Sequence, residues 1–150
     1  MASGAGGSDS VIANKNGDEK NTDVATGRKF YVLVVDDDRA TQMIHSMMFK
    51  RYGLETQVAG NGKEAVELYR SGASFHLVLM DLEMPVMDGC EATRELRAMG
   101  VTSMIVGVTS ADLDSVKEAF VSAGLDGCYG KPLTVDNVKS SLQELDNKKF

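Results

Sequence analysis

Short apolar runs alternate with amphipathic stretches five times between residues 30 and 145. Five runs have the length and composition of strands: residues 30–35, 54–58, 75–80, 104–108 and 128–130. Five stretches place apolar residues at helical spacing: residues 40–52, 65–69, 90–99, 113–120 and 135–145. The pattern therefore predicts five consecutive βα units.

The alternation of strands and helices also predicts the architecture. Strands joined by helical crossovers form a parallel sheet with helices on both faces. The run at 75–80 is the most continuous, as expected for a central strand that is buried on both sides. We therefore expect a three-layer α/β domain whose site lies outside the carboxyl ends of its strands.

A single domain accounts for the chain. Its 150 residues, 43% of them hydrophobic, suffice for one core, which we place between residues 29 and 146. Residues 1–28 consist largely of Gly, Ser, Ala, Asn, Asp and Lys, which bury too little apolar surface to offset the entropy of ordering. We expect a disordered N-terminal tail there and a short C-terminal tail at residues 147–150.

Charge and cysteine content narrow the function. The net charge of -6 argues against nucleic acid and anionic membranes as partners. No stretch approaches the roughly 18 apolar residues of a membrane span, and the N-terminus lacks the apolar segment of a signal peptide. Two cysteines, Cys90 and Cys128, are too few for a disulfide framework or a zinc cluster. We expect a cytoplasmic protein, with nuclear entry left open.

Charged and hydroxylated residues lie at the ends of four predicted strands: Asp36 with Asp37, Asp81, Thr109 and Lys131. Three carboxylates at adjacent strand ends repel one another in a partly desolvated crevice unless a cation lies among them. Oxygen ligands without His or Cys favour Mg²⁺ or Mn²⁺ over zinc. The sequence therefore predicts a divalent metal site formed by carboxylates.

The same residues suit phosphoryl transfer. If Asp37 and Asp81 hold the metal, one oxygen of Asp81 stays free to attack phosphorus and form an aspartyl phosphate. Lys131 and Thr109 can then bind phosphoryl oxygens. The chain has no P-loop spacing, so we expect the phosphate to arrive on a small molecule or a partner protein.

The motifs together resemble a known family. Residues 34–37 read VVDD, residues 79–89 LMDLEMPVMDG, residues 108–109 VT and residues 131–132 KP. In this order and spacing they resemble the receiver domain of two-component response regulators over nearly all of residues 30–145. The resemblance implies a flavodoxin-like fold with five parallel strands in the order 2-1-3-4-5 and five helices. It also implies Mg²⁺-dependent transfer of phosphate from a phosphohistidine.

Each site residue takes a role from this resemblance. Asp81 corresponds to the phospho-acceptor, and Thr109 and Lys131 correspond to the two residues that bind phosphoryl oxygens. The implied metal ligands are Asp37 and Asp81 directly, Asp36 largely through water, and the backbone carbonyl of Glu83.

The partners follow from a narrower resemblance. Residues 87–94, MDGCEATR, resemble receivers of multi-step phosphorelays, in which a histidine-containing phosphotransfer protein or a histidine kinase donates the phosphate. Stand-alone regulators, including the plant group called type C, combine such a receiver with no output domain, and cytokinin signalling is the expected plant context. We expect a monomer that serves either as a signal carrier or as a phosphate sink.

One position departs from the family pattern. Receivers usually place Tyr or Phe three residues before the lysine, where this chain has Cys128 before Lys131. Alternation along the strand sends Tyr129 to the other face of the sheet. The departure favours a sink over a carrier. The resemblance further implies a cis peptide bond between Lys131 and Pro132.

The predicted first helix carries more apolar side chains than a surface helix buries: Met43, Ile44, Met47, Met48, Phe49 and Tyr52. Some of them must therefore face solvent. The resemblance places docking of the phosphotransfer partner near this helix, and methionines suit an adaptable contact surface.

Two alternative functions remain open. A phosphohydrolase with an aspartate nucleophile needs a second aspartate two positions on as general acid, where this chain has Glu83. A pseudo-receiver that only binds partners would not need the intact set of site residues. Any catalysis by a receiver is limited to its own phosphorylation and dephosphorylation.

Several further polar residues are expected to be structural. Asp38 and Asp88 suit the first turn of helices, where an acidic side chain is favourable. His45 and His76 lack the motif of a phosphorylated histidine, and we interpret them as packing residues. We interpret both cysteines in the same way.

Overall fold

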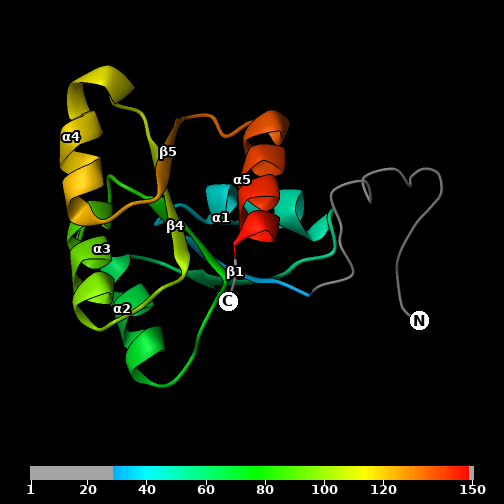
Figure 1. Cartoon of the computed structure of the whole chain (residues 1–150), viewed down its shortest axis with the longest axis horizontal. Helices are drawn as coiled ribbons and strands as arrows, with labels where there is room; N and C mark the ends of the chain where they lie inside the picture. Colours follow the sequence, from blue (N-terminus) through cyan, green and yellow to red (C-terminus); the bar gives the residue numbers. More distant parts are fainter. Residues whose placement is uncertain (1–28, 149–150) are drawn as a thin grey trace.

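The computed structural model describes residues 29–148, and the predicted N-terminal tail lies outside them (Figure 1). Five strands alternate with five helices in this part of the chain. The strands are β1 (Tyr31–Val35), β2 (Glu55–Ala59), β3 (Leu77–Asp81), β4 (Met104–Thr109) and β5 (Gly127–Gly130). The helices are α1 (Arg39–Lys50), α2 (Gly62–Arg70), α3 (Gly89–Ala98), α4 (Leu113–Ala123) and α5 (Val135–Asn147).

The strands form one parallel sheet in the order β2-β1-β3-β4-β5. This confirms the predicted five-stranded flavodoxin-like topology. The order brings β1 and β3 side by side at the centre of the sheet, with Val35 paired to Met80. The residues that end these two strands are therefore neighbours, although about 45 positions separate them in the sequence.

Two hydrophobic layers enclose the sheet, as the three-layer prediction requires. Helices α1 and α5 cover one face, where Phe49 and Leu142 pack against alternate strand residues such as Val34. Helices α2, α3 and α4 cover the other face, where Leu96 and Phe120 pack against the intervening residues (Figure 1). Within residues 29–148, no helix has the length and hydropathy to span a bilayer.

Each helix begins near the carboxyl end of the preceding strand, at a residue whose side chain accepts a backbone N–H. These N-caps are Asp38, Asn61, Asp88, Asp112 and Thr134. Asp38 and Asp88 thus have the structural role predicted for them. Because the positive end of the helix dipole lies at the N-terminus, all five helices direct partial positive charge toward the same edge of the sheet.

The third strand begins two residues later than predicted, at Leu77 instead of residue 75. The reason lies in the side chain of His76, whose Nδ1 accepts the Tyr31 N–H at 3.0 Å, so that the imidazole takes the place of a backbone acceptor. The ring also stacks on Tyr31, with centroids 5.7 Å apart. His76 is therefore a structural residue, as predicted, but it lies before the strand.

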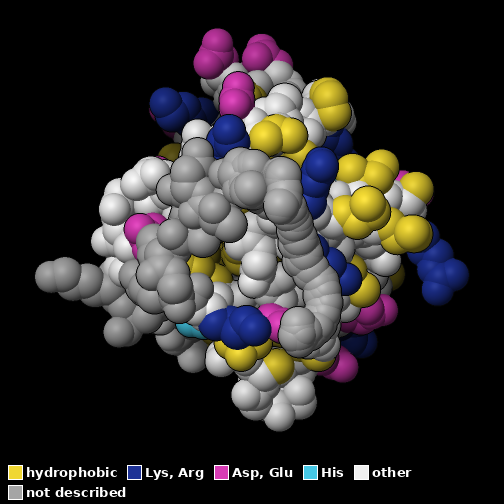
Figure 2. Space-filling model, turned by 90° about the vertical axis from the view of Figure 1, so that its right-hand side faces the viewer, with side chains coloured by type: hydrophobic (Ala, Val, Ile, Leu, Met, Phe, Trp, Pro, Cys, Tyr) yellow, Lys and Arg dark blue, Asp and Glu magenta, His cyan; other side chains and the backbone are white. Residues whose placement is uncertain are grey.

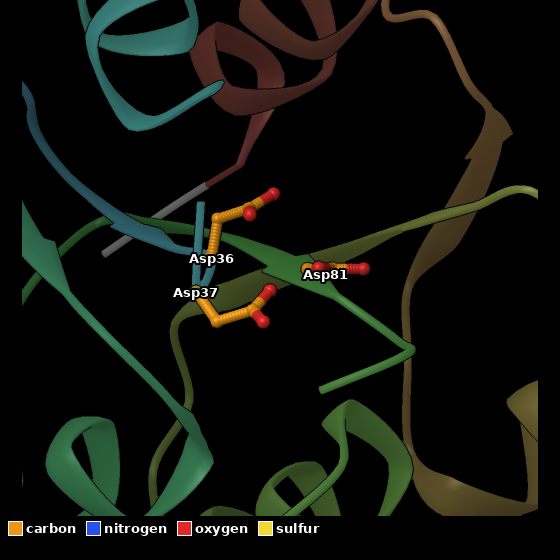
Figure 3. A group of neighbouring side chains, drawn as sticks. All are labelled: Asp36, Asp37 and Asp81. Carbon is orange, nitrogen blue, oxygen red and sulfur yellow. The ribbon is translucent and has the colours of Figure 1, made fainter. Parts of the chain in front are cut away.

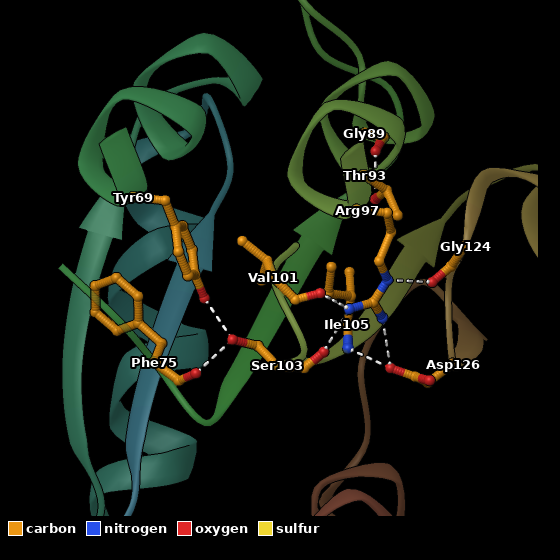
Figure 4. Close-up of polar contacts among 10 residues, drawn as sticks. All are labelled: Tyr69, Phe75, Gly89, Thr93, Arg97, Val101, Ser103, Ile105, Gly124 and Asp126. Carbon is orange, nitrogen blue, oxygen red and sulfur yellow. Dashed lines mark hydrogen bonds and ion pairs between the residues drawn. The ribbon is translucent and has the colours of Figure 1, made fainter. Parts of the chain in front are cut away.

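Arg97 connects the end of α3 to the two loops that lead into β4 and β5 (Figure 4). Its guanidinium donates to three backbone carbonyls and one carboxylate: Val101 O and Ser103 O at 2.9 Å, Gly124 O at 3.0 Å and Asp126 Oδ2 at 2.9 Å. Gly124 has a φ of 105°, and a Cβ there would lie 2.8 Å from Arg97 Cγ. The arginine thus holds both loops through four hydrogen bonds from one guanidinium group.

We predict that Arg97→Met lowers the free energy of unfolding by about 2–4 kcal/mol, because it leaves partly buried carbonyl groups without a donor. Methionine keeps the helix propensity and much of the apolar stem. Urea denaturation followed by far-UV circular dichroism measures the change. The matched control is Arg70→Met, which removes an exposed pair with Glu95 at 3.4 Å and should cost less than about 0.5 kcal/mol. Equal losses in the two variants would contradict a special role for Arg97.

Candidate functional site

Three carboxylates meet at the carboxyl edge of the sheet (Figure 3). Asp36 and Asp37 directly follow β1, and Asp81 is the last residue of β3. One oxygen from each lies within 4.8 Å of one oxygen from each of the others. The structure thus brings together the three acidic residues that the sequence predicted at adjacent strand ends.

The positions of two of these carboxylates are fixed by local hydrogen bonds. Asp36 Oδ1 accepts the N–H of Asp38 at 2.9 Å, and the Gln42 side chain donates to the Asp36 carbonyl at 2.6 Å. Asp81 Oδ1 accepts the N–H of Glu83 at 3.1 Å. Asp36 and Asp81 are buried, whereas Asp37 is exposed. Two carboxylates of the cluster are therefore held in place inside the protein, and the third is open to solvent.

Burial raises the pKa of Asp36, although the Asp38 N–H and nearby Lys131 partly oppose the shift. Burial likewise raises the pKa of Asp81, against the hydrogen bonds from Lys131 and Glu83. In both cases the protein's own donors and charges do not fully compensate the desolvation of the carboxylate. A hard divalent cation would supply the missing positive charge, and three carboxylate oxygens are ligands that such a cation prefers. The donor set fits a divalent metal.

Lys131 reaches the same cluster from the loop after β5. Its Nζ lies 3.0 Å from Asp81 Oδ1, and its backbone N–H donates to the Thr109 carbonyl at 2.8 Å. Burial opposes the ammonium charge, but the hydrogen bond to Asp81 and the charges of Asp81, Asp36 and Glu83 outweigh it and raise the pKa of Lys131. The Lys131–Pro132 peptide bond is cis, as the resemblance implied.

Thr109 ends β4 next to the cluster and is fully buried. Its hydroxyl donates to Glu83 Oε2 and accepts the Ala111 N–H at 3.0 Å. The other Glu83 oxygen accepts the N–H and the hydroxyl of Ser110 at 3.1 and 3.2 Å. Burial opposes ionisation of Glu83, but these hydrogen bonds from Thr109 and Ser110 outweigh it and lower the pKa of Glu83.

The side chain of Glu83 is the part of the site that sequence reasoning missed. The sequence assigned this residue only a backbone carbonyl, through the family resemblance. Loop residues follow no periodic pattern, so no spacing in the chain indicates which side chain the Glu83 carboxylate meets. The other predicted site residues lie at the carboxyl ends of their strands, as predicted: Asp36, Asp37, Asp81, Thr109 and Lys131.

The family of the chain follows from comparison with known proteins. The family described as response regulator receiver domain matches residues 32–143. The chain belongs to the response regulator receiver family. The two-component response regulator ARR22 of Arabidopsis thaliana is 51% identical over 121 residues, covering 79% of this chain and 85% of that protein. Two-component response regulator 24 of the same plant is 44% identical over 118 residues, with the same coverage of each chain.

Solved structures show the same fold. The receiver domain of Ssk1 from Saccharomyces cerevisiae, crystallised with the histidine phosphotransfer protein Ypd1, has a TM-score of 0.72 and 26% identity, covering 78% of this chain and 88% of that one. The receiver domain of the sensor histidine kinase PA1611 from Pseudomonas aeruginosa has a TM-score of 0.70 and 26% identity, covering 81% and 100%. That structure has a magnesium ion coordinated in its active-site cleft.

Strand β5 of this receiver places Cys128 and Tyr129 on opposite faces of the sheet, as strand alternation predicts. Tyr129 packs on the α1 and α5 side, where its hydroxyl lies 3.5 Å from Ser141 Oγ. Cys128 packs on the other side and, with Phe120, lines a pocket of about 350 Å³ between α4 and β5 that is partly open to solvent. Burial raises the pKa of the Cys128 thiol to about 11. A thiol of this kind is protonated at neutral pH, in agreement with the predicted packing role.

The loop between Asp81 and α3 contains a strained residue. Met87 N–H donates to the Pro85 carbonyl at 2.8 Å, and the residue between them, Val86, has a φ of 73° and is 76% exposed. A β-branched residue with positive φ is sterically unfavourable. Gly89 ends the loop because a Cβ there would lie 2.5 Å from the Asp81 carbonyl oxygen. The loop therefore turns tightly around the end of β3.

We predict that Val86→Gly raises the free energy of unfolding by up to about 1 kcal/mol, because glycine relieves a strain of roughly 1–2 kcal/mol and loses roughly 0.5–1 kcal/mol in chain entropy. Chemical denaturation measures the difference. Val121→Gly serves as control, since Val121 is also exposed but lies in the regular helix α4, where glycine should cost up to about 0.5 kcal/mol. A loss of stability in both variants would show that Val86 is unstrained.

Proposed function

We propose that this receiver accepts a phosphoryl group from a phosphohistidine onto Asp81, in a Mg²⁺-dependent reaction. The observation that carries the proposal is the position of Asp81, whose carboxylate lies among Asp36, Asp37 and Lys131 at one edge of the sheet. A nucleophile, a donor set for a cation and a fixed ammonium group together are what transfer of a phosphoryl group requires. The Ssk1 receiver crystallised with Ypd1 supports a phosphotransfer protein as the donor.

The transfer exchanges one bond to phosphorus for another. An oxygen of Asp81 attacks the phosphorus and forms a P–O bond, while the P–N bond of the phosphohistidine breaks. The electron pair of the broken bond stays on the imidazole nitrogen, which is left neutral once the ring holds a single proton. Lys131 Nζ lies 3.0 Å from Asp81 Oδ1 in the unphosphorylated protein, and it neutralises charge on the transferred group. Water later hydrolyses the resulting acyl phosphate, which releases inorganic phosphate and restores the carboxylate.

The acidic residues would hold the metal ion. Asp37 and Asp81 bind it directly in this proposal, Asp36 acts largely through water, and the Glu83 carbonyl adds a further ligand. A bound Mg²⁺ or Mn²⁺ supplies positive charge for the phosphoryl oxygens and lowers the repulsion between them and the carboxylates. The magnesium in the PA1611 receiver supports this assignment.

The alternative of a phosphohydrolase is disfavoured by the position of Glu83. A general acid in such an enzyme must deliver a proton to the leaving group, so its carboxyl group must be protonated and free to move. The Glu83 carboxylate instead accepts hydrogen bonds from Thr109 and Ser110, which lower its pKa. A group held in its ionised form is a poor proton donor.

We predict that incubation with acetyl phosphate and Mg²⁺ adds one phosphoryl group to the chain, detected as an increase in intact mass. Asp81→Asn should abolish the added mass, because an amide cannot form the acyl phosphate. Removal of Mg²⁺ with EDTA should slow the reaction of the wild type at least about tenfold. Asp112→Asn, at an exposed helix cap where asparagine also serves, is the matched control and should react like the wild type. An adduct that persists in Asp81→Asn would refute the assignment.

We further propose that the phosphotransfer partner docks on an apolar patch of α1 beside this site. The patch consists of Met43, Ile44 and Met47, which are 66%, 57% and 59% exposed. Figure 2 shows hydrophobic side chains gathered at the surface on the side of the molecule where α1 and α5 lie. The N-terminus of α1 follows the metal-binding aspartates directly, so a partner seated on the patch can reach Asp81. Flexible methionines suit a contact of this kind.

Replacing Met43 and Met47 together with Ser should slow phosphoryl transfer from a phosphorylated phosphotransfer protein by about tenfold or more, since buried apolar area is lost from the contact. The rate with acetyl phosphate should stay unchanged, because a small donor needs no docking surface. Val121→Ser on α4 removes a similarly exposed apolar residue elsewhere and should affect neither rate. If transfer from the protein donor is unaffected in the double variant, the docking site lies elsewhere.

A further inference from the structure

The hydroxyl of Thr109 is occupied by Glu83 in this structure. A threonine hydroxyl has a single proton to donate, and Thr109 donates it to Glu83 Oε2. The same oxygen of Thr109 also accepts the Ala111 N–H at 3.0 Å, which holds it in place. Thr109 is fully buried, so its hydroxyl has no access to solvent as an alternative partner. It cannot donate to a phosphoryl oxygen on Asp81 while this contact persists.

We infer that Glu83 is a positioning residue that opposes phosphorylation by holding Thr109 and Ser110 in the conformation of the unphosphorylated protein. The inference rests on the proposed function, in which Thr109 binds a phosphoryl oxygen on Asp81. Phosphorylation then exchanges the Thr109–Glu83 hydrogen bond for one from Thr109 to the phosphoryl group. The free energy lost with the Glu83 contact therefore reduces the free energy gained when Thr109 binds the phosphoryl group.

Glu83 is suited to this role by its position in the chain. Its backbone N–H donates to Asp81 Oδ1 at 3.1 Å, so the residue is attached to the carboxylate that reacts. Its side chain crosses to β4 and the loop that follows, where Ser110 binds Oε1 through both its N–H and its hydroxyl. One residue thus connects the reacting group of β3 to the start of the loop that leads into α4.

Charge adds to the effect of the hydrogen bonds. The Glu83 carboxylate lies close enough to Lys131 to raise the pKa of that lysine, so the two groups attract each other. A phosphoryl group on Asp81 needs the same ammonium and brings further negative charge near Glu83. Two negative groups that share one partly buried site repel each other, which disfavours the phosphorylated form.

The initial rate of phosphorylation by acetyl phosphate with Mg²⁺, measured by intact mass on the full chain, tests the inference. Glu83→Ala should react roughly five- to tenfold faster than the wild type, because one hydrogen bond to a charged group no longer competes for Thr109. Glu83→Gln keeps an acceptor oxygen and loses the charge, so its rate should lie between the two. Ser110→Ala keeps the Thr109–Glu83 bond and should change the rate less than Glu83→Ala does.

A double-mutant cycle shows whether Glu83 acts through Thr109. In a Thr109→Val background, which keeps the shape of the side chain but lacks the hydroxyl, Glu83→Ala should accelerate the reaction much less, because only the charge of Glu83 then opposes phosphorylation. An effect on folding or on charge alone would accelerate it equally in both backgrounds. Thermal denaturation of each variant confirms that it is folded under the conditions of the assay.

The outcomes separate the inference from the proposed function. Unchanged or slower reaction of Glu83→Ala, with an adduct that still depends on Asp81, would overturn the role of Glu83 and leave the phospho-acceptor in place. Equal acceleration with and without the Thr109 hydroxyl would also overturn it. Failure of every variant and of the wild type to form an Asp81-dependent adduct would refute the proposed function itself.

Discussion

The burial of two carboxylates at the ends of neighbouring strands is the constraint on which the rest of this structure depends. Asp36 and Asp81 are each 3% exposed, and desolvation raises the pKa of both. Three features compensate for the buried charge: backbone N–H donors, Lys131 after the outer strand β5, and the N-termini of five helices. All of them lie at the carboxyl ends of the strands, next to the carboxylates. The compensation is incomplete, and a divalent cation bound at this edge would supply the missing positive charge.

Hydrogen bonds at the amino ends of the strands, on the side of the sheet opposite the charged site, help to keep that site rigid. Arg97 joins the end of α3 to the loops before β4 and β5, and Asp126, which it binds, also accepts the Ile105 N–H at 2.8 Å (Figure 4). The Ser103 hydroxyl bonds to the Phe75 carbonyl, and Tyr69 lies 2.7 Å from the same hydroxyl. These contacts fix the amino ends of β3 and β4. Because the strands are short and buried, Asp81 and Thr109 at their other ends are held in register by the same contacts.

Sequence patterns predicted the parts of this molecule that depend on local periodicity and on the order of elements. The strand runs and helix caps such as Asp38 follow from rules that act along a few residues. The clustering of Asp36 with Asp81 follows from the position of both residues at strand ends. The strained φ of Val86 and the path of the Glu83 side chain follow from how tightly the loop turns around β3. That geometry is set by tertiary packing, which no spacing in the chain encodes.

Because Cys128 stands where an aromatic residue was expected, the Glu83 contact is a candidate for the link between Asp81 and α4. Cys128 lines a pocket of about 350 Å³ on the α4 side of β5, and the tyrosine of this strand, Tyr129, packs on the other side. Helix α4 is attached to the domain by few buried side chains, Phe120 and Ala123. Two residues, Ala111 and Asp112, separate Ser110 from the start of α4, and Glu83 accepts hydrogen bonds from both Thr109 and Ser110. If Glu83 has the inferred role, loss of this contact on phosphorylation changes the conformation of the loop before α4 directly. Phosphorylation can then alter the surface around α4 without an aromatic side chain on that face of β5.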